Sequence, residues 1–201
     1  MKKKILILGP QVRNIRIIKN LKKKYSVVLS NKKISKNFLI RKNISIIITS
    51  GYPYLVKNNL IKFVDIAINL HNSYLPYGRG IYPNVWCFVE SYPSGITIHE
   101  LDKKFDTGAI ILQKKIYFNN IKKHTLKTTH DILIKELEKF FLKNYEKIFN
   151  SMFKKYSQSK YNKCTRYHNR KESENLMKNF KLRWNTKILE VKKFKKNMLI
   201  K

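Results

Sequence analysis

Residues 65–80 read DIAINLHNSYLPYGRG. The apolar start predicts a buried β-strand, and the proline and glycines at the end predict a shaped loop. Because side chains alternate across a pleated strand, Asn69 and His71 are expected on one face and Leu70 on the other. Both polar residues stand at the carboxyl end of the strand, where open α/β sheets bind their ligands. This stretch therefore indicates an α/β sheet with a site at the end of one of its strands.

Similar short apolar runs, rich in isoleucine and valine, recur on both sides of this stretch. They alternate with polar or helix-periodic segments, which is typical of β-α units around a mostly parallel sheet. The sequence therefore predicts an α/β fold with a Rossmann-like, mostly parallel sheet and flanking helices. The six strands are expected at residues 5–8, 26–29, 44–49, 65–70, 96–101 and 110–117.

Two segments have the apolar period of amphipathic helices. For residues 11–24, the expected buried face is Val12, Ile15, Ile18 and Leu21. For residues 125–153, a long helix, it is Leu126, Leu133, Leu137, Phe140 or Phe141, and Ile148. Beyond Lys154 the chain is polar and rich in lysine, and we expect a tail without an assigned structure.

Composition excludes several classes of protein. The only two cysteines, Cys87 and Cys164, are too few for a disulfide scaffold, and without a C-x-x-C motif they do not indicate a zinc ribbon. Gly9 supplies just the first glycine of G-x-G-x-x-G, so NAD or FAD binding is not expected. No apolar run approaches the roughly eighteen residues of a membrane helix. We therefore expect a cytoplasmic protein.

The formal net charge is +32, from 44 lysines and arginines against 12 acidic residues. Such charge attracts phosphate backbones. However, only seven of the 44 basic residues are arginine, the residue that recognises phosphates and bases through two parallel hydrogen bonds. We therefore expect a solvated lysine surface rather than a nucleic-acid interface, and nucleic acid is not an expected partner.

A second strand with polar residues at its end lies at residues 95–108, which read GITIHELDKKFDTG. The apolar start predicts a strand, and it is followed by a charged loop with a carboxylate just before a glycine turn. We expect this loop to bring Asp106 alongside His71. His99, near the end of the strand, is expected to support the site rather than to act as the primary acid or base.

Four short motifs in these stretches resemble the formyltransferase family that takes a one-carbon group from 10-formyltetrahydrofolate. They are N-x-H at 69–71, S-x-L-P-x-x-x-G at 73–80, G-x-T-x-H at 95–99 and D-x-G at 106–108. Together they match in order and spacing over roughly residues 44–118. The resemblance implies a formyltransferase-type core, with a catalytic domain at residues 1–153 and a C-terminal extension at 154–201 that packs on it or binds a partner.

The resemblance also implies that Asn69, His71 and Asp106 are the catalytic residues. Transfer of a formyl group from a folate nitrogen to an amine passes through a tetrahedral intermediate with a negative oxygen, which needs fixed hydrogen-bond donors. The Asn69 amide and the His71 imidazole can supply them. Asp106 would favour the imidazolium and help to remove the proton of the amine. No covalent nucleophile is required.

Ligand contacts follow from the same resemblance. The residues expected to hold 10-formyltetrahydrofolate, the formyl donor, are Tyr54, Leu55, Val56 and Lys104. The residues expected to hold the acceptor are Tyr77, Arg79, Tyr82 and Trp86. An arginine there suits a phosphate, and the aromatic rings suit a base or a sugar. This loop is similar to that of family members that formylate an amino sugar carried on a nucleoside diphosphate.

Alternatives stay open. Within the family, the acceptor could instead be glycinamide ribonucleotide or methionyl-tRNA. From other classes, the same residues could hydrolyse 10-formyltetrahydrofolate, or the chain could be a non-catalytic basic domain that binds nucleic acid. No metal is expected, because His124, His130 and His168 lack ligand spacing. The expected partners are a folate and an anionic amine substrate, with no membrane and with a homodimer as the candidate assembly.

Overall fold

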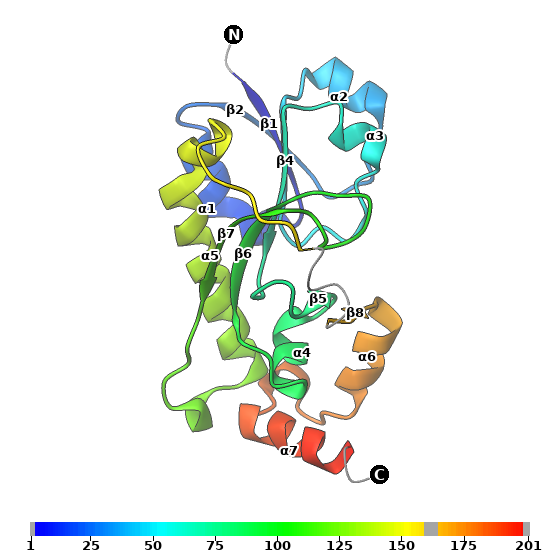
Figure 1. Ribbon diagram of the computed structural model, residues 1–201, viewed down its shortest axis with the longest axis vertical. Helices are drawn as coiled ribbons and strands as arrows, with labels where there is room; N and C mark the ends of the chain where they lie inside the picture. The colour runs from blue at the N-terminus through cyan, green and yellow to red at the C-terminus, as the bar shows by residue number, and fades with distance from the viewer. Residues whose placement is uncertain (1–2, 159–164, 199–201) are drawn as a thin grey trace. The chain divides into compact units, whose positions relative to one another are not determined.

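The computed structural model describes residues 3–158 and 165–198 (Figure 1). The strands are β1 (Lys4–Leu8), β2 (Ser26–Ser30), β3 (Ile46–Thr49), β4 (Ile66–His71), β5 (Arg79–Gly80), β6 (Gly95–Glu100), β7 (Ile110–Lys115) and β8 (Tyr167–His168). The helices are α1 (Gln11–Leu21), α2 (Lys36–Lys42), α3 (Asn58–Ile61), α4 (Pro83–Val89), α5 (Leu126–Phe149), α6 (Arg170–Lys178) and α7 (Ile188–Met198), with 3₁₀ turns η1 (Ile121–Lys123) and η3 (Arg183–Asn185). Cys164 and parts of the predicted extension lie outside the described residues.

The predicted fold class is confirmed. Six strands form one mixed sheet in the order β2-β1-β3-β4-β6-β7, and every predicted strand bound lies within two residues of the observed one. The pairs β1·β2, β1·β3 and β3·β4 are parallel. β6 runs antiparallel to β4, because the Leu101 amide just after β6 donates to the Ala67 carbonyl near the start of β4 at 2.8 Å. This reversal brings the end of β6 back along β4.

The chain forms two compact units, each built from several segments of the sequence. Unit 1 consists of residues 1–71, 98–112 and 137–157, and unit 2 of residues 72–97, 113–136 and 158–201. Within the described part of the extension, residues 154–157 belong to unit 1, whereas residues 158 and 165–198 belong to unit 2 together with two earlier segments. The assignment of a catalytic domain and an extension stays a prediction.

Helices cover both faces of the strands of unit 1 (Figure 1). On one face, α1 lies beside the C-terminal part of α5, with ion pairs from Arg16 to Glu138 at 3.5 Å and from Lys24 to Glu146. On the other face lie α2 and α3. The core on that side consists of Leu6, Leu8, Leu39, Ile44, Ile47, Val56 and Leu60. With both faces covered, the inner strands β1 and β3 are continuous apolar runs, as their sequence requires.

The buried face predicted for α1 is wrong in part. Val12 is 89% exposed and Ile15 57% exposed, whereas the buried stripe is Asn14, Ile17 and Leu21. Asn14 is buried because its amide nitrogen donates to the carbonyl oxygens of Pro10, at 2.9 Å, and Ser50, at 3.3 Å. A polar residue that satisfies backbone carbonyls can occupy a core position, and a purely apolar pattern does not detect it.

The buried face predicted for the long helix is confirmed. Leu126, Leu133, Leu137, Phe141 and Ile148 are all buried, with Phe141 rather than Phe140 on the stripe. In unit 2, the first part of α5 packs with α4, α6 and α7. The core of this unit consists of Val85, Trp86, Phe88, Val89, Leu126, Leu176, Met177, Phe180, Ile188 and Val191.

Candidate active site

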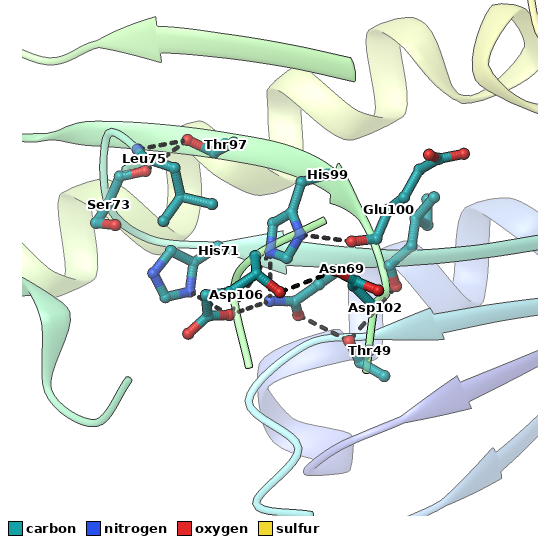
Figure 2. Close-up of polar contacts among 12 residues, drawn as sticks. Thr49, Asn69, His71, Ser73, Leu75, Thr97, His99, Glu100, Asp102 and Asp106 are labelled. Carbon is teal, nitrogen blue, oxygen red and sulfur yellow. Dashed lines mark hydrogen bonds and ion pairs between the residues drawn. The ribbon is translucent and has the colours of Figure 1, made fainter. Parts of the chain in front are cut away.

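Four polar side chains of unit 1 meet at the carboxyl end of β4 (Figure 2). Asn69 and His71 come from β4, with Leu70 between them buried in the core. β6 contributes His99, and the loop after β6 brings Asp106 to the same place. The expected juxtaposition of Asp106 and His71 is therefore present.

The side-chain amide of Asn69 joins the other members of this cluster. Its Nδ2 lies 3.2 Å from Asp106 Oδ1 and 3.0 Å from His99 Nε2. Asp106 Oδ1 and His99 Nε2 are 3.6 Å apart. Both atoms are hydrogen-bond acceptors, so they would repel each other if no hydrogen lay between them. The two amide hydrogens, one toward each acceptor, hold the carboxylate and the imidazole together.

The partners of His99 fix its tautomer. Its Nδ1 lies 2.7 Å from the backbone carbonyl oxygen of Glu100, which can only accept, so Nδ1 carries the hydrogen. Nε2 of the neutral ring then accepts from Asn69. His99 is buried and orients the amide, and its supporting role in the site stays a prediction.

His71 and Asp106 form an ion-pair geometry. His71 Nδ1 lies 3.6 Å from Asp106 Oδ1, and the two side chains are only 6% and 9% exposed to solvent. A nearby carboxylate favours the imidazolium form. The Nδ1 edge of the ring faces Asp106, so the opposite edge is turned away from the carboxylate (Figure 2). The three residues predicted as catalytic are thus together, and their roles remain predictions.

The loop that carries Asp106 is held in an unusual backbone conformation. Asp106 has a φ of 56°, in the left-handed region, which aspartate tolerates better than most residues. Asp102 braces the loop by accepting from the Lys103 amide at 2.7 Å and from Thr107 Oγ1 at 3.1 Å. Gly108 is required sterically, because a Cβ there would lie 1.9 Å from the Glu100 carbonyl oxygen.

Thr49 is a member of the site that the sequence analysis did not identify. Its Oγ1 donates to Asn69 Oδ1 at 2.7 Å, which fixes which end of the amide faces Asp106. The parallel register pairs Thr49 with Asn69 across β3 and β4. The available signal was a polar residue at the end of the isoleucine run of β3, which follows the same pattern as Asn69 in β4.

The residues predicted to hold the folate differ in exposure. Tyr54 is 39% exposed and Leu55 42% exposed, whereas Val56 is buried in the core of unit 1. Val56 can therefore offer only its backbone, and Lys104 is exposed. The Tyr54 ring has Lys33 Nζ 5.3 Å from its centroid. Exposed rings and aliphatic groups in this segment suit a flat, apolar ligand.

Two of the predicted acceptor residues lie partly exposed in unit 2. The Tyr77 ring lies 4.8 Å from that of Tyr92, and the Tyr82 ring meets Trp184 edge-on at 5.3 Å. Ser73 Oγ donates to the carbonyls of Tyr77 and Gly78, at 2.7 and 3.2 Å. These contacts give the loop after β4 a defined shape.

The other two predicted acceptor residues are buried and have protein partners. Arg79 Nη2 donates to Thr165 Oγ1 at 2.8 Å and to the Thr165 carbonyl oxygen. Trp86 stacks on His168 with ring centroids 3.6 Å apart, and its Nε1 donates to Ser173 Oγ at 2.9 Å. Both side chains support the loop in this structure, and a direct role for them in binding the acceptor stays a prediction.

Within residues 3–158 and 165–198, no group of three or more histidine, cysteine, aspartate or glutamate side chains could hold a metal ion. Over the same described ranges, no helix has the length and apolar character needed to cross a membrane.

Desolvation lowers the pKa of the Arg13 guanidinium to about 10, so this side chain beside Gly51 remains a cation at neutral pH.

A family model described as formyl transferase matches residues 17–142, which is 126 of the 201 residues. The chain belongs to the formyl transferase family. The matched segment includes Asn69, His71 and Asp106, so the resemblance inferred from the four motifs is confirmed.

Curated members of the formyl transferase family match over shorter stretches. The dTDP-4-amino-4,6-dideoxyglucose formyltransferase of Mycobacterium bovis is 40% identical over 49 residues, covering 24% of this chain and 21% of the relative. The GDP-perosamine N-formyltransferase of Brucella melitensis is 36% identical over 72 residues, covering 35% and 28%. The chain thus spans between about a fifth and somewhat more than a quarter of the length of these relatives.

A solved structure of the family matches almost the whole chain. It is the formyltransferase PseJ from Anoxybacillus kamchatkensis, crystallised with UDP-4,6-dideoxy-4-formamido-L-AltNAc and tetrahydrofolate. The TM-score is 0.82 and the sequence identity is 32%, with 94% of this chain and 97% of that chain covered. The formyltransferase-type core expected from the sequence is therefore present.

Proposed function

We propose that this protein transfers a formyl group from 10-formyltetrahydrofolate to the amino group of a sugar carried on a nucleoside diphosphate. The observation that carries the proposal is the cluster of Asn69, His71, His99 and Asp106, in which one amide holds a carboxylate next to an imidazole. Membership of the formyl transferase family supports the reaction type. The named ligands of the PseJ structure support the acceptor class.

His71 and Asn69 would stabilise the charge that develops on the formyl oxygen. A donor aimed at that oxygen acts most strongly in a site sheltered from water, and His71 is 6% exposed. The two Asn69 hydrogens are directed at Asp106 and His99, so an added bond to the formyl oxygen would replace or share the longer contact, the one to Asp106 at 3.2 Å. Asn69 therefore both positions Asp106 and donates during the reaction.

Asp106 would accept the proton that the attacking amine loses. The neutral amine attacks the formyl carbon and then loses a proton, so a base is needed close to the reacting nitrogen. The bond from the formyl carbon to the folate nitrogen breaks, and the leaving nitrogen takes up a proton. The Asp106 carboxylate is fixed by Asn69 and faces His71 at 3.6 Å, which lets it hold the imidazolium and accept the proton directly or through water. The polar bracing of its loop by Asp102 keeps this geometry.

The donor would bind to exposed apolar groups of unit 1. Tyr54 and Leu55 offer side-chain surface after β3, Val56 offers its backbone, and Lys104 offers a cation for a carboxylate. Phe105, next to Asp106, is also 36% exposed. Burial of these groups by the ligand would contribute binding free energy in proportion to the apolar area covered.

The acceptor would bind to the loop of residues 77–86. Tyr77 and Tyr82 offer ring surface there, and aromatic rings suit both bases and sugars. Arg79 and Trp86 shape this loop from its buried side.

Formylation assays with a set of acceptors test the proposal. The set contains dTDP-4-amino-4,6-dideoxyglucose, GDP-perosamine and the amine corresponding to UDP-4,6-dideoxy-4-formamido-L-AltNAc, with glycinamide ribonucleotide as a competing acceptor. Folate turnover is followed by absorbance, and the N-formyl product by mass spectrometry. We expect turnover that requires an amino-sugar nucleotide. Formate release at the same rate without any acceptor would instead identify a hydrolase.

Two finer expectations belong to the same proposal. We propose that the enzyme works in the cytoplasm and as a homodimer. Fractionation of cells that contain the tagged chain tests the location, and light scattering after size exclusion tests the assembly. A mass of about 24 kDa in solution would show a monomer, because one chain has a mass of 24.1 kDa.

A further inference from the structure

His168 is a buried histidine in unit 2 that the proposed reaction does not use. Its side chain has 0% exposure and lies between two carboxylates, with Nε2 3.1 Å from Glu90 Oε2 and Nδ1 3.4 Å from Glu172 Oε1. A carboxylate only accepts hydrogen bonds, so both ring nitrogens must donate. The ring is therefore an imidazolium. Arg166, 2.6 Å from Glu172 Oε1, supplies the second positive charge that balances the two carboxylates.

The imidazolium lies flat against the indole of Trp86. The ring centroids are 3.6 Å apart and the ring planes differ by 8°, which is the geometry of a cation over an aromatic face. The indole is fixed at its other edge, where Nε1 donates to Ser173 Oγ at 2.9 Å. Ser173 Oγ in turn donates to the Ile81 carbonyl oxygen at 3.0 Å. Residues of α6 and β8 thus hold both α4 and the segment before it.

The main chain makes a second set of contacts between the same segments. β5 pairs with β8, with Arg79 opposite Tyr167 and Gly80 opposite His168. The Ile81 amide donates to the His168 carbonyl oxygen at 2.9 Å. Gly80 has a φ of 98°, and a Cβ there would lie 2.1 Å from the same carbonyl oxygen. No larger residue can replace this glycine without moving the two strands apart.

The segment held in this way is the loop proposed to bind the acceptor. Its Tyr82 has a φ of 55°, a conformation that costs a non-glycine residue free energy and persists only where surrounding contacts impose it. The Tyr82 ring is also packed edge-on against Trp184. The shape of the loop therefore depends on residues about 90 positions later in the chain, such as Ser173, which is 92 residues from Ile81.

We propose that His168, locked between Glu90 and Glu172, is a positioning residue for the acceptor. It fixes Trp86 and the loop of residues 79–82 before the acceptor binds, and it touches neither the substrates nor the reacting atoms. The inference rests on the proposed function, because that function assigns the loop to the acceptor. A loop held in its binding shape loses less entropy when the ligand binds, so loosening it weakens affinity. The hydrogen bonds among Asn69, His99 and Asp106, in the cluster proposed to be catalytic, all lie in unit 1, so we expect the chemical step to stay intact.

Two variants weaken the contacts of His168, and the first of them does so with little change in volume. Glu90→Gln removes one charge next to the imidazolium, and His168→Phe keeps a ring against Trp86 but removes both donors. Glu174→Gln is the matched control, because Glu174 lies on the same helix as Glu172 and is paired with Arg170 at the exposed surface. For both test variants we expect the acceptor KM to rise about tenfold, with kcat at saturating acceptor and the folate KM unchanged. The control should match the wild type.

Tryptophan emission supplies a readout that a general loss of stability would not reproduce. In a Trp184→Phe background, Trp86 is the sole tryptophan, since the chain has two. A protonated imidazole stacked on an indole quenches the fluorescence of the indole. The fluorescence of Trp86 should therefore rise when Glu90→Gln or His168→Phe is added, and should stay constant when Glu174→Gln is added. Unchanged Trp86 fluorescence in both test variants would overturn the proposal that His168, held by Glu90 and Glu172, fixes Trp86.

Calorimetric titration with the acceptors, without folate, separates failure of this inference from failure of the proposed function. If the wild type binds an amino-sugar nucleotide without formylating it, the proposed transfer is wrong. The positioning role is still supported in that case if the test variants bind the nucleotide about tenfold more weakly. Equal dissociation constants in wild type, Glu90→Gln and His168→Phe would overturn the positioning role alone. A fall in kcat at unchanged acceptor KM would also overturn it, since the lock would then serve the fold rather than the acceptor.

Discussion

Two clusters in the molecule combine histidine with carboxylates but in different geometries. In unit 2, His168 has a carboxylate oxygen 3.1 Å from one ring nitrogen and another 3.4 Å from the other, so both nitrogens face a hydrogen-bond acceptor. In unit 1, His71 and His99 each lie 3.6 Å from Asp106, with the Asn69 amide inserted between acceptors. The tighter cluster is suited to hold structure, and the looser one is suited to exchange protons.

The carboxylates of Asp106 and Glu90 should therefore respond differently when their charge is removed. Asp106→Asn keeps the size of the side chain but removes the charge that faces His71, and kcat should fall about a hundredfold or more. Glu90→Gln should leave kcat unchanged. Steady-state kinetics with saturating donor and acceptor make the comparison, with Asp131→Asn, an exposed carboxylate of α5, as control. Similar kcat values for Asp106→Asn and Glu90→Gln would remove the distinction between the clusters.

A matched pair of glycine substitutions extends the contrast to the backbone. An added Cβ would lie 1.9 Å from the Glu100 carbonyl oxygen at Gly108 and 2.1 Å from that of His168 at Gly80. Each alanine variant should lose about 2 kcal/mol of unfolding free energy through overpacking. Gly108→Ala should mainly lower kcat, and Gly80→Ala should mainly raise the acceptor KM, each by about tenfold. Chemical denaturation and kinetics measure both effects, and the same kinetic pattern in the two variants would contradict the account.

Thr49 offers a sharper probe of the predicted catalytic cluster of Asn69, His71, His99 and Asp106. Thr49→Val keeps the shape but removes the hydroxyl that donates to Asn69 Oδ1, so the amide can rotate and release Asp106. We expect kcat to fall about tenfold, because second partners of site residues commonly matter to this extent. Thr49→Ser retains the hydroxyl and should restore most of the rate. A low rate in Thr49→Ser would show that the methyl group, rather than the hydrogen bond, is important.

Much of unit 1 was predictable from local pattern. Its strands are apolar runs bounded by turn residues, and Asn69, His71 and Asp106 occur where such runs end. The antiparallel course of β6 was not predictable, since alternation of apolar residues does not record strand direction. Thr49 was passed over because it forms no motif of its own and becomes informative only once the register pairs it with Asn69.

Unit 2 was harder to predict because its key contacts join distant segments. Arg79 and Trp86 have the chemistry of ligand-binding residues, yet the structure buries them against Thr165 and His168. Nothing near them in the sequence shows that partners 80 or more positions later would cover them. The polar, lysine-rich composition after Lys154 also concealed α6 and α7, whose buried faces are short and are completed by α4.

The donor site should give a smaller effect. Leu55→Ser removes apolar surface from an exposed position, so it should raise the folate KM several-fold, by about the loss expected for a partly buried leucine, without lowering stability. Val12→Ser is the control, because Val12 is more exposed but lies on α1, outside the predicted donor site. Thermal unfolding checks stability, and equal folate KM values in the two variants would remove Leu55 from the donor site.

The smallest effect is expected at Cys87. Burial raises the pKa of its thiol to about 12, with the nearby Glu90 adding to the shift, so the thiol stays protonated between pH 7 and 9. In a Cys164→Ser background, a disulfide reagent should modify the native protein at least about a hundredfold more slowly than the unfolded chain. The rate is followed by absorbance. Rapid modification of the native protein at pH 7 would show that this part of unit 2 opens readily.

The catalytic role proposed for the cluster around Asn69 is tested most directly by one labelled turnover. Excess enzyme is mixed with the amino-sugar nucleotide and 10-formyltetrahydrofolate carrying ¹³C in the formyl group, and the label is located by NMR in wild type and in His71→Gln. Calorimetry first establishes that the variant binds both substrates. The account predicts that the label moves to the amine nitrogen in the wild type and stays on the folate in His71→Gln over the same time. Transfer by His71→Gln at the wild-type rate would contradict it.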